Sequence, residues 1–282
     1  VMILFGTYMG FYNQGLALEV IDFNTLGLLL GMMILVALLE PTGFFQYLAV
    51  WVGKISKGKP VTLLVLLGAV TTVISMFLDN VTTVVLIAPV TILICEILGY
   101  NAQPFLISEA LLSNTGGVST LVGDPPNILI ASSAGLSFND FLVKSLPIVF
   151  VVWFVALAAV RFVFREELKP GEHSNPDAVL NLNPREAIKD MPGIIKSLVM
   201  IVLAVIGFIF EKVIHLAPST VALTSASFAL FWIRPGKLKE TLNKVEWDIL
   251  IFFGALFVIV GDLENAGVLN LIADIMANWR TL

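Results

Sequence analysis

The sequence predicts an all-α polytopic membrane protein. Of its 282 residues, 58% are hydrophobic and only 13% are charged, whereas about a quarter of the residues are charged in a typical soluble domain. The mean hydropathy is +0.95. Apolar runs long enough to cross a bilayer recur along the whole chain. A soluble globular domain is therefore disfavoured.

The first apolar elements are a partial span over about 1–17 and a full span over about 23–39. A proline and Gly43 end the second span. The segment that follows, 43–57, is short and amphipathic, with lysines at its end. We expect it to lie in the membrane interface as an arm helix rather than to cross the bilayer.

Two apolar stretches, about 61–78 and 84–98, flank a polar tip with the sequence DNVTT. We predict that 61–98 is a re-entrant hairpin, because a charge at the bilayer centre costs about 2.5–3.5 kcal/mol on insertion scales and needs a function. The asparagine and threonines offer neutral oxygens, and the aspartate can bind a cation or a proton. An ordinary polar loop between two spans is the alternative. The candidate site residues of the tip are Asp79, Asn80, Thr82 and Thr83.

A second polar interruption divides the apolar segment 104–134. The Gly116–Gly117 pair permits unusual backbone angles and close approach to a ligand, and the Pro125–Pro126 pair removes two N–H donors. A helix that unwinds over 115–124 would expose carbonyls at membrane depth, where irregular backbone survives only inside protein or around a watery cavity. A loop between two short helices is the alternative. The candidate site residues here are Asn114, Thr115, Gly116, Gly117, Asp124 and Asn127.

Further long spans are predicted over about 144–164, 194–211, 218–233 and 246–263. The polar segment 165–192 between the first two is interpreted as a flexible cytoplasmic loop. With these spans, 13 of the 16 Lys and Arg residues fall on or near one face. The positive-inside rule makes this face cytoplasmic.

The segment 21–43 has an echo in the segment 245–267. IDFNTLGLLLGMMILVALLEPTG aligns with VEWDILIFFGALFVIVGDLENAG, and both copies end in Glu-x-x-Gly. An odd number of predicted crossings separates the copies, so the second copy is inverted, as in many secondary transporters. We therefore expect a first repeat over 1–164 and an incomplete second repeat, truncated at the C-terminus, over 193–282.

Three stretches carry a resemblance to a known family, namely SMFLDNVTTVVLIAPVTILICEIL, SNTGGVSTLVGDPPNILI and VEWDILIFFGALFVIVG. They resemble the ion-transporter superfamily, which contains arsenite permeases, citrate and dicarboxylate transporters and some Na+/H+ antiporters. Within it, the chain is most similar to pink-eyed-dilution (P-protein) type permeases. The resemblance covers almost the whole chain and implies an elevator-type mechanism, in which the hairpin and the broken helix form half of a moving transport domain.

In the dicarboxylate branch of this superfamily, the hairpin tip reads Ser-Asn-Thr and, with the broken helix, binds Na+ and the substrate carboxylate. Asn80 matches the asparagine of that tip, whereas Asp79 replaces its serine and Val81 its threonine. Asp124 stands where that branch commonly has threonine. The two added carboxylates disfavour a dicarboxylate substrate and imply a cation- or proton-coupled process. The broken-helix residues that match the pattern are Gly116, Gly117, Pro125, Pro126 and Asn127.

The predicted function is secondary active transport of small ions, with Na+ or H+ as coupling ion, in a multi-pass protein of the plasma or inner membrane. An anion channel-like permease that uses the same cavity is the alternative. An intramembrane aspartyl protease would need Gly-x-Gly-Asp, but Asp124 follows Leu-Val-Gly, so we expect no enzyme. Expected partners are a small inorganic or organic ion, the bilayer and a second copy in a homodimer. No cofactor, metal site or nucleic acid is expected.

Overall fold

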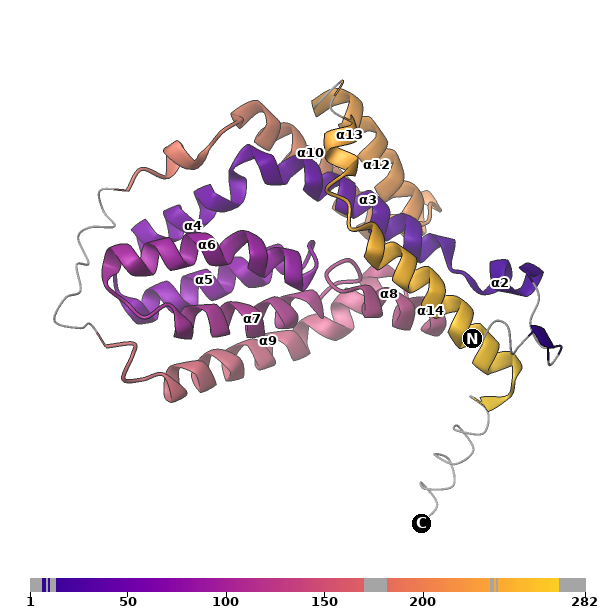
Figure 1. Ribbon diagram of the computed structural model, residues 1–282, viewed down its shortest axis with the longest axis horizontal. Helices are drawn as coiled ribbons and strands as arrows, with labels where there is room; N and C mark the ends of the chain where they lie inside the picture. Colours follow the sequence, from indigo (N-terminus) through magenta and orange to yellow (C-terminus); the bar gives the residue numbers. More distant parts are fainter. Residues whose placement is uncertain are drawn as a thin grey trace, which may run out of the picture. The chain divides into compact units, whose positions relative to one another are not determined.

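The protein is described here by a computed structural model (Figure 1). It describes residues 7–8, 10, 14–169, 182–233, 236 and 238–268. These residues are mostly helical and include no strand, which confirms the predicted all-α class. The chain divides into two compact units, Val1–Gly27 with Glu246–Leu282, and Leu28–Val245.

Four helices of the described residues are long and apolar enough to cross a membrane. They are Phe23–Thr42, Asn80–Leu98, Phe138–Val163 and Met191–Ile209. The helices α5 (Pro60–Ser75) and α12 (Pro218–Ile233) are apolar but shorter. This set of apolar helices is consistent with the polytopic membrane class.

The unit that contains the N-terminus has two described helices, α2 (Gln14–Val20) and α14 (Trp247–Asn265). They touch where a Cβ added to Gly261 would lie 2.6 Å from Val20 Cγ1. Most of the predicted first span, 1–17, lies outside the described residues. The predicted span 246–263 does form a helix, α14, but three acidic residues keep it out of the four candidate spans.

The helix α3 (Phe23–Leu39) coincides with the predicted second span. The Asp22 carboxylate accepts from the amides of Asn24 and Thr25 at 2.9 and 3.1 Å and so caps its start. A 3-10 turn, η1 (Glu40–Thr42), and Gly43 at φ 86° end it. The conformation of Gly43 is the left-handed one that glycine adopts without a steric penalty.

The predicted arm helix is α4 (Phe44–Ile55), which is too short to cross a bilayer. It buries Phe45, Ala49 and Val52 and lies beside α5 and α6 (Asn80–Leu98) (Figure 1). Its interfacial position stays a prediction, because the structure contains no membrane.

The helices α5 and α6 form a hairpin whose tip is the short segment 76–79. At the opposite end, the Tyr100 hydroxyl donates to the Gly58 carbonyl at 2.5 Å and ties the two outer ends together. The segment 61–98 is therefore a hairpin, as predicted from its apolar halves and polar tip. Whether it enters and leaves a bilayer on one side stays a prediction.

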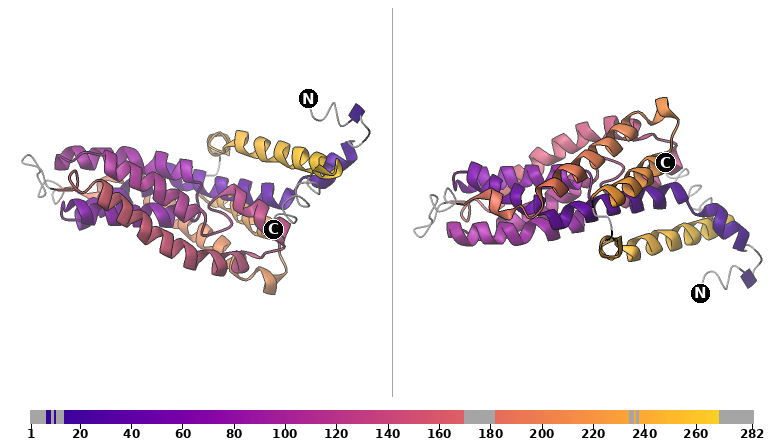
Figure 2. Two further views of the ribbon diagram at one scale, coloured as in Figure 1. Left: turned by 90° about the horizontal axis from the view of Figure 1, so that it is seen from below. Right: turned by 90° about the horizontal axis from the view of Figure 1, so that it is seen from above.

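The predicted broken helix consists of α7 (Gln103–Gly117) and α8 (Pro125–Ala134), separated by the irregular segment 118–124. The helix therefore stops slightly later than predicted and resumes at the expected prolines. The helix α7 packs along α5 at very close range, since a Cβ on Gly68 would lie 2.3 Å from Leu112 Cδ1. Figures 1 and 2 show α5, α6, α7 and α9 (Phe138–Val163) running lengthwise beside one another.

The remaining elements of this unit are α10 (Met191–Ile209), α11 (Glu211–Ile214), α12 and α13 (Leu238–Leu242). A capping box of Ser137 and Asp140 starts α9. The carboxylate of Asp140 also binds Lys212 at 2.9 Å. Asn139 Nδ2 donates to the Ile209 carbonyl at 2.6 Å, so the start of α9 meets the end of α10, as in an antiparallel pair.

The described end of the predicted flexible loop is attached to the rest of its unit. The short turn η3 (Pro184–Ala187) precedes two amides, of Lys189 and Asp190, that donate to the Thr42 carbonyl at 2.9 and 3.2 Å. The Lys54 ammonium donates to the Leu182 carbonyl at 3.2 Å. Residues 182–190 are therefore held against η1 and α4. Residues 170–181 of the loop lie outside the described part.

In the two copies of the predicted repeat, the helix begins at aligned sequence positions, and a glycine with positive φ follows at aligned positions. The helix α3 begins at Phe23 and α14 at Trp247, which are aligned positions in the two copies. Gly43 and Gly267 are also aligned with each other, and both have positive φ, 86° and 75°.

Gly116 tests the close packing of α7 on α5. An added Cβ would lie 2.3 Å from the Thr72 carbonyl oxygen and 2.9 Å from Thr72 Cα. Because backbone atoms cannot rotate away, Gly116→Ala should destabilise the protein by about 1–3 kcal/mol, as overpacking does. The measurement is the melting temperature in detergent, read from the loss of the monodisperse peak in size-exclusion chromatography after heating.

Gly254→Ala in α14 is the matched control, because its nearest neighbour would be Leu26 Cδ1 at 3.9 Å. Alanine also favours a helix over glycine by up to about 1 kcal/mol. Its melting temperature should stay the same or rise. Equal melting temperatures for the two variants would contradict the packing described here.

Candidate functional site

The amide of Asn80 joins the hairpin tip to both halves of the broken helix. Its Nδ2 donates to Asn114 Oδ1 at 3.0 Å, in the last turn of α7. The same nitrogen donates to Asp124 Oδ2 at 3.2 Å, at the start of α8. On its other side, Asn80 Oδ1 lies 3.0 Å from the Ser75 hydroxyl of α5. One side chain thus connects the ends of four helices.

Asp79 and Asp124 hold different positions around this amide. The Asp79 carboxylate accepts from the Thr82 amide at 2.9 Å and caps α6. Asp124 precedes α8 but makes no side-chain cap, and its carboxylate turns to Asn80 instead. Both side chains are half-buried. They lie close enough to repel each other electrostatically when both are ionised.

The irregular segment 118–124 is fastened by side chains rather than by helical hydrogen bonds. Asn127 Nδ2 donates to the carbonyls of Gly117 and Thr120, each at 2.8 Å. The Thr120 hydroxyl donates to the Met76 carbonyl in the hairpin tip. It also accepts from the amides of Val122 and Gly123 at 3.2 and 3.1 Å. These bonds satisfy backbone groups that a break in a helix leaves open.

Gly117 allows the amide of Asn80 to approach the end of α7. A Cβ on Gly117 would lie 2.2 Å from Asn80 Oδ1 and 3.0 Å from the Gly123 carbonyl oxygen. Gly116, by contrast, faces Thr72 of α5 and serves packing. The two neighbouring glycines therefore have different roles, which the sequence alone did not distinguish.

The structure brings most of the predicted site residues together, but not all. Asn80, Asn114 and Asp124 are hydrogen-bonded to one another. Thr115 donates back to Leu111 within its own helix. Thr83 is fully buried, and its hydroxyl has no described partner. Gly117 lies against the Asn80 amide, Asn127 binds the Gly117 carbonyl, and Asp79 binds the Thr82 amide.

Sequence reasoning missed Ser75 and Thr120. The Ser75 hydroxyl lies 2.7 Å from the Ser113 carbonyl oxygen as well as near Asn80, so it links α5 to α7. The signal for Ser75 was its place in the apolar run just before the tip, where a hydroxyl has no role in a lipid-facing helix. The contact of Thr120 with Met76 depends on the tertiary fold.

Away from the hairpin tip, α6 and α7 share a buried polar pair. Glu109 of α7 is fully buried, and the Thr91 hydroxyl of α6 donates to its Oε1 at 2.5 Å. Its other oxygen, Oε2, has no described hydrogen-bond partner. An acid inside the apolar run PFLISEALL was the available signal, because ionisable residues in membrane segments are rare and usually functional.

Comparison with known proteins decides the family. The sequence model of the citrate transporter family (CitMHS) matches residues 1–282. The chain belongs to the citrate transporter family. An uncharacterized transporter of Mycobacterium tuberculosis is 46% identical over 253 residues, which are 90% of this chain and 58% of that protein. The magnetosome protein MamN of Magnetospirillum gryphiswaldense is 32% identical, over 96% of this chain and 62% of its own length.

The mouse P protein is 30% identical to this citrate transporter family member over 326 aligned residues, 91% of this chain and 39% of the mouse protein. The predicted resemblance to the ion-transporter superfamily and its P-protein type permeases is therefore confirmed. The family and the Mycobacterium tuberculosis relatives are named as transporters and not as enzymes, in line with the prediction. It spans between about two fifths and three fifths of the length of these relatives.

The site contains no cluster of the usual metal ligands. Among the described residues, no group of three or more His, Cys, Asp or Glu side chains is placed to hold a metal ion. The oxygens bonded to the Asn80 side chain come from a hydroxyl, an amide and a carboxylate, those of Ser75, Asn114 and Asp124. Hard cations prefer oxygen ligands of these kinds.

The buried pair of Thr91 and Glu109 predicts a difference between two threonine variants. Thr91→Val removes the donor to a fully buried carboxyl oxygen. Leaving such a group unsatisfied costs about 1–3 kcal/mol, so the melting temperature in detergent should fall. Thr71→Val in α5 is the control, because that buried hydroxyl has no described partner to lose. A loss of stability as large in Thr71→Val as in Thr91→Val would show that Glu109 does not need the Thr91 hydroxyl.

Proposed function

We propose that this citrate transporter family member is a secondary active transporter of small ions, coupled to Na+ or H+. The proposed ion site lies between the hairpin tip and the break between α7 and α8. The observation that carries the proposal is the position of the Asn80 amide, which binds Asn114 and Asp124. Asp79 caps α6, the helix that begins at Asn80.

The chemistry around this amide supports a cation as one of the bound ions. Two half-buried carboxylates, Asp79 and Asp124, repel each other when both are ionised. A proton or a cation between them removes that repulsion. Unwound helix ends coordinate Na+ in secondary transporters, and α7 ends beside these carboxylates. The two carboxylates at the site would also repel a carboxylate group of the substrate, so a substrate with such a group beside them is disfavoured.

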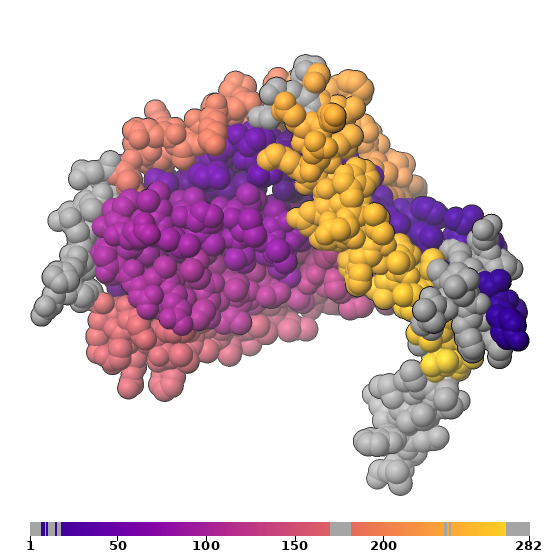
Figure 3. Space-filling model, in the orientation of Figure 1, coloured from indigo at the N-terminus to yellow at the C-terminus, as the bar shows by residue number. Residues whose placement is uncertain are grey.

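The packing of the hairpin and the broken helix supports movement as one body. Gly68, Gly116 and Gly123 each bring the backbone of one element against another. Figure 3 shows the surface of α6 and α7, in violet and magenta, as a continuous closely packed face. A rigid block of this kind is what an elevator-type mechanism requires of a transport domain. The helix α4, which follows the bend at Gly43, is the proposed arm.

The matching positions of Gly43 and Gly267 support an internal repeat. We propose that the repeat is inverted and that, in a full-length family member, the second copy supplies the other half of the site. The chain covers 58% of the length of the Mycobacterium tuberculosis relative. Transport should therefore be measured on a protein with the length of the family relatives.

Asp79→Asn separates the charge of this residue from its role as a helix cap. Asparagine caps a helix about as well as aspartate, whereas alanine loses about 0.5–2 kcal/mol. We expect Asp79→Asn to keep its melting temperature and to lose coupled flux by at least about tenfold, which corresponds to about 1.4 kcal/mol. Asp79→Ala should lose both. The measurement is uptake into proteoliposomes under imposed Na+ and pH gradients, with arsenite and small carboxylates as trial substrates.

Asp140→Asn is the control, because Asp140 starts a helix of the same unit and pairs with Lys212 away from the site. Its flux should equal that of the wild type. Wild-type flux in Asp79→Asn, with unchanged dependence on pH and Na+, would overturn the proposed site. Flux that does not saturate with substrate concentration would favour the channel-like permease.

A further inference from the structure

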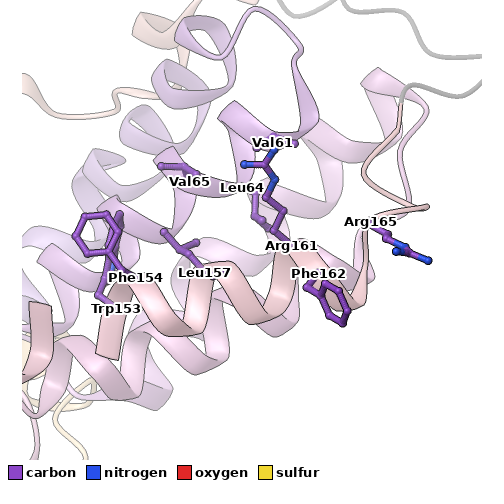
Figure 4. A pocket seen from close by; sticks show the side chains of 10 residues that line it. Val61, Leu64, Val65, Trp153, Phe154, Leu157, Arg161, Phe162 and Arg165 are labelled. Atoms are coloured by element: carbon purple, nitrogen blue, oxygen red, sulfur yellow. The ribbon is translucent and has the colours of Figure 1, made fainter. Parts of the chain in front are cut away.

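A groove of about 530 Å³ runs between α5 and α9 (Figure 4). Eight of its ten lining residues are apolar, and the other two are Arg161 and Arg165. Figure 4 shows Trp153 and Phe154 at one end of the groove and the two arginines toward the other. The groove is therefore apolar along most of its length and positively charged at one end. Its volume is in the range of ligand-binding pockets, roughly 300–1,000 Å³.

The two arginines are available to an anion from outside the chain. Arg165 Nε lies 3.6 Å from Glu166 Oε1, and both side chains are about two-thirds exposed, at 68% and 67%. Exposed pairs of this kind are weak, and Glu166 also binds Lys169 at 2.6 Å. Within the described part of the chain, no carboxylate forms an ion pair with Arg161. Guanidinium groups bind phosphate through two parallel hydrogen bonds.

We propose that this groove binds an anionic phospholipid, with one acyl chain between α5 and α9 and the phosphate on Arg161 and Arg165. The apolar walls match a hydrocarbon chain, and the charged end matches a phosphate. The helix α9 is long enough to cross a membrane, and both arginines lie at its C-terminal end. The distribution of Lys and Arg assigns this end to the cytoplasmic face, where anionic lipids concentrate near basic residues.

A bound lipid would contact α5, which belongs to the hairpin that carries part of the candidate ion site. The helix α5 forms one wall of the groove and also the first half of the hairpin. At the aromatic end, the Trp153 indole N–H donates to the Thr72 hydroxyl of α5 at 3.0 Å. Thr72 is the residue against which Gly116 packs. The lipid therefore stabilises the contact between α9 and the hairpin.

The test compares two lipids with the same acyl chains, phosphatidylglycerol and phosphatidylcholine, added to the full-length protein in a neutral detergent. Lipid retention is measured by native mass spectrometry, together with the melting temperature. Phosphatidylglycerol should be retained about 25-fold better, from two guanidinium groups, and should raise the melting temperature more. One guanidinium near an anionic lipid corresponds to about a fivefold change in affinity. The double variant Arg161→Gln, Arg165→Gln should therefore retain phosphatidylglycerol no better than phosphatidylcholine.

Two further variants separate the groove from the charges. Ala158→Trp fills the groove and leaves both arginines in place, so it should also lose the retained lipid; Val65→Phe, a smaller change, does the same if the first variant fails to fold. Lys144→Gln removes a cation of α9 that does not line the groove and should change nothing. Equal retention of both lipids by the wild type, or wild-type retention by the double arginine variant, would overturn the proposal. The proposal would also be overturned if glycerol phosphate displaced bound phosphatidylglycerol as well as free phosphatidylglycerol does, because the site would then recognise a soluble anion.

Discussion

The candidate site depends on the close approach of backbones that glycine allows between α5 and the end of α7. A Cβ on Gly116 or Gly123 would lie 2.3 or 2.4 Å from a carbonyl oxygen of α5. Because neither residue has a side chain, the last turn of α7 and the segment 118–124 rest directly on the end of α5. This position places Asn114 and Asp124 within hydrogen-bond distance of Asn80 Nδ2.

The break between α7 and α8 also leaves backbone groups that need hydrogen-bond partners, and side chains supply them. A helix broken inside an apolar environment leaves carbonyls and amides without partners. In this chain Asn127, Thr120 and Ser119 each bind such groups with a short, stiff side chain. Short side chains lose little conformational entropy when they are ordered. The break is thus held by specific hydrogen bonds, and so are the oxygens bonded to the Asn80 amide.

The sequence predicted the helices, the hairpin and the broken helix because each leaves a local pattern. Apolar runs marked α3, α9 and α10, and the paired glycines and prolines marked the break. The sequence did not predict the separate roles of Gly116 and Gly117, because the difference depends on which neighbour each one faces. The contact between Thr120 and Met76 joins residues 44 positions apart and leaves no periodic signal. The attachment of residues 182–190 was missed for the same reason, since a polar, proline-rich composition is also typical of free loops.

The Thr42 carbonyl, which accepts from the amides of Lys189 and Asp190, has a consequence for the topology of the chain. The bend at Gly43 is clamped by a segment that is far away along the sequence, and Ala187 O lies where a Gly43 side chain would begin. A change at Ala187 would therefore alter the direction in which α4 leaves the bend, although the two are far apart along the chain.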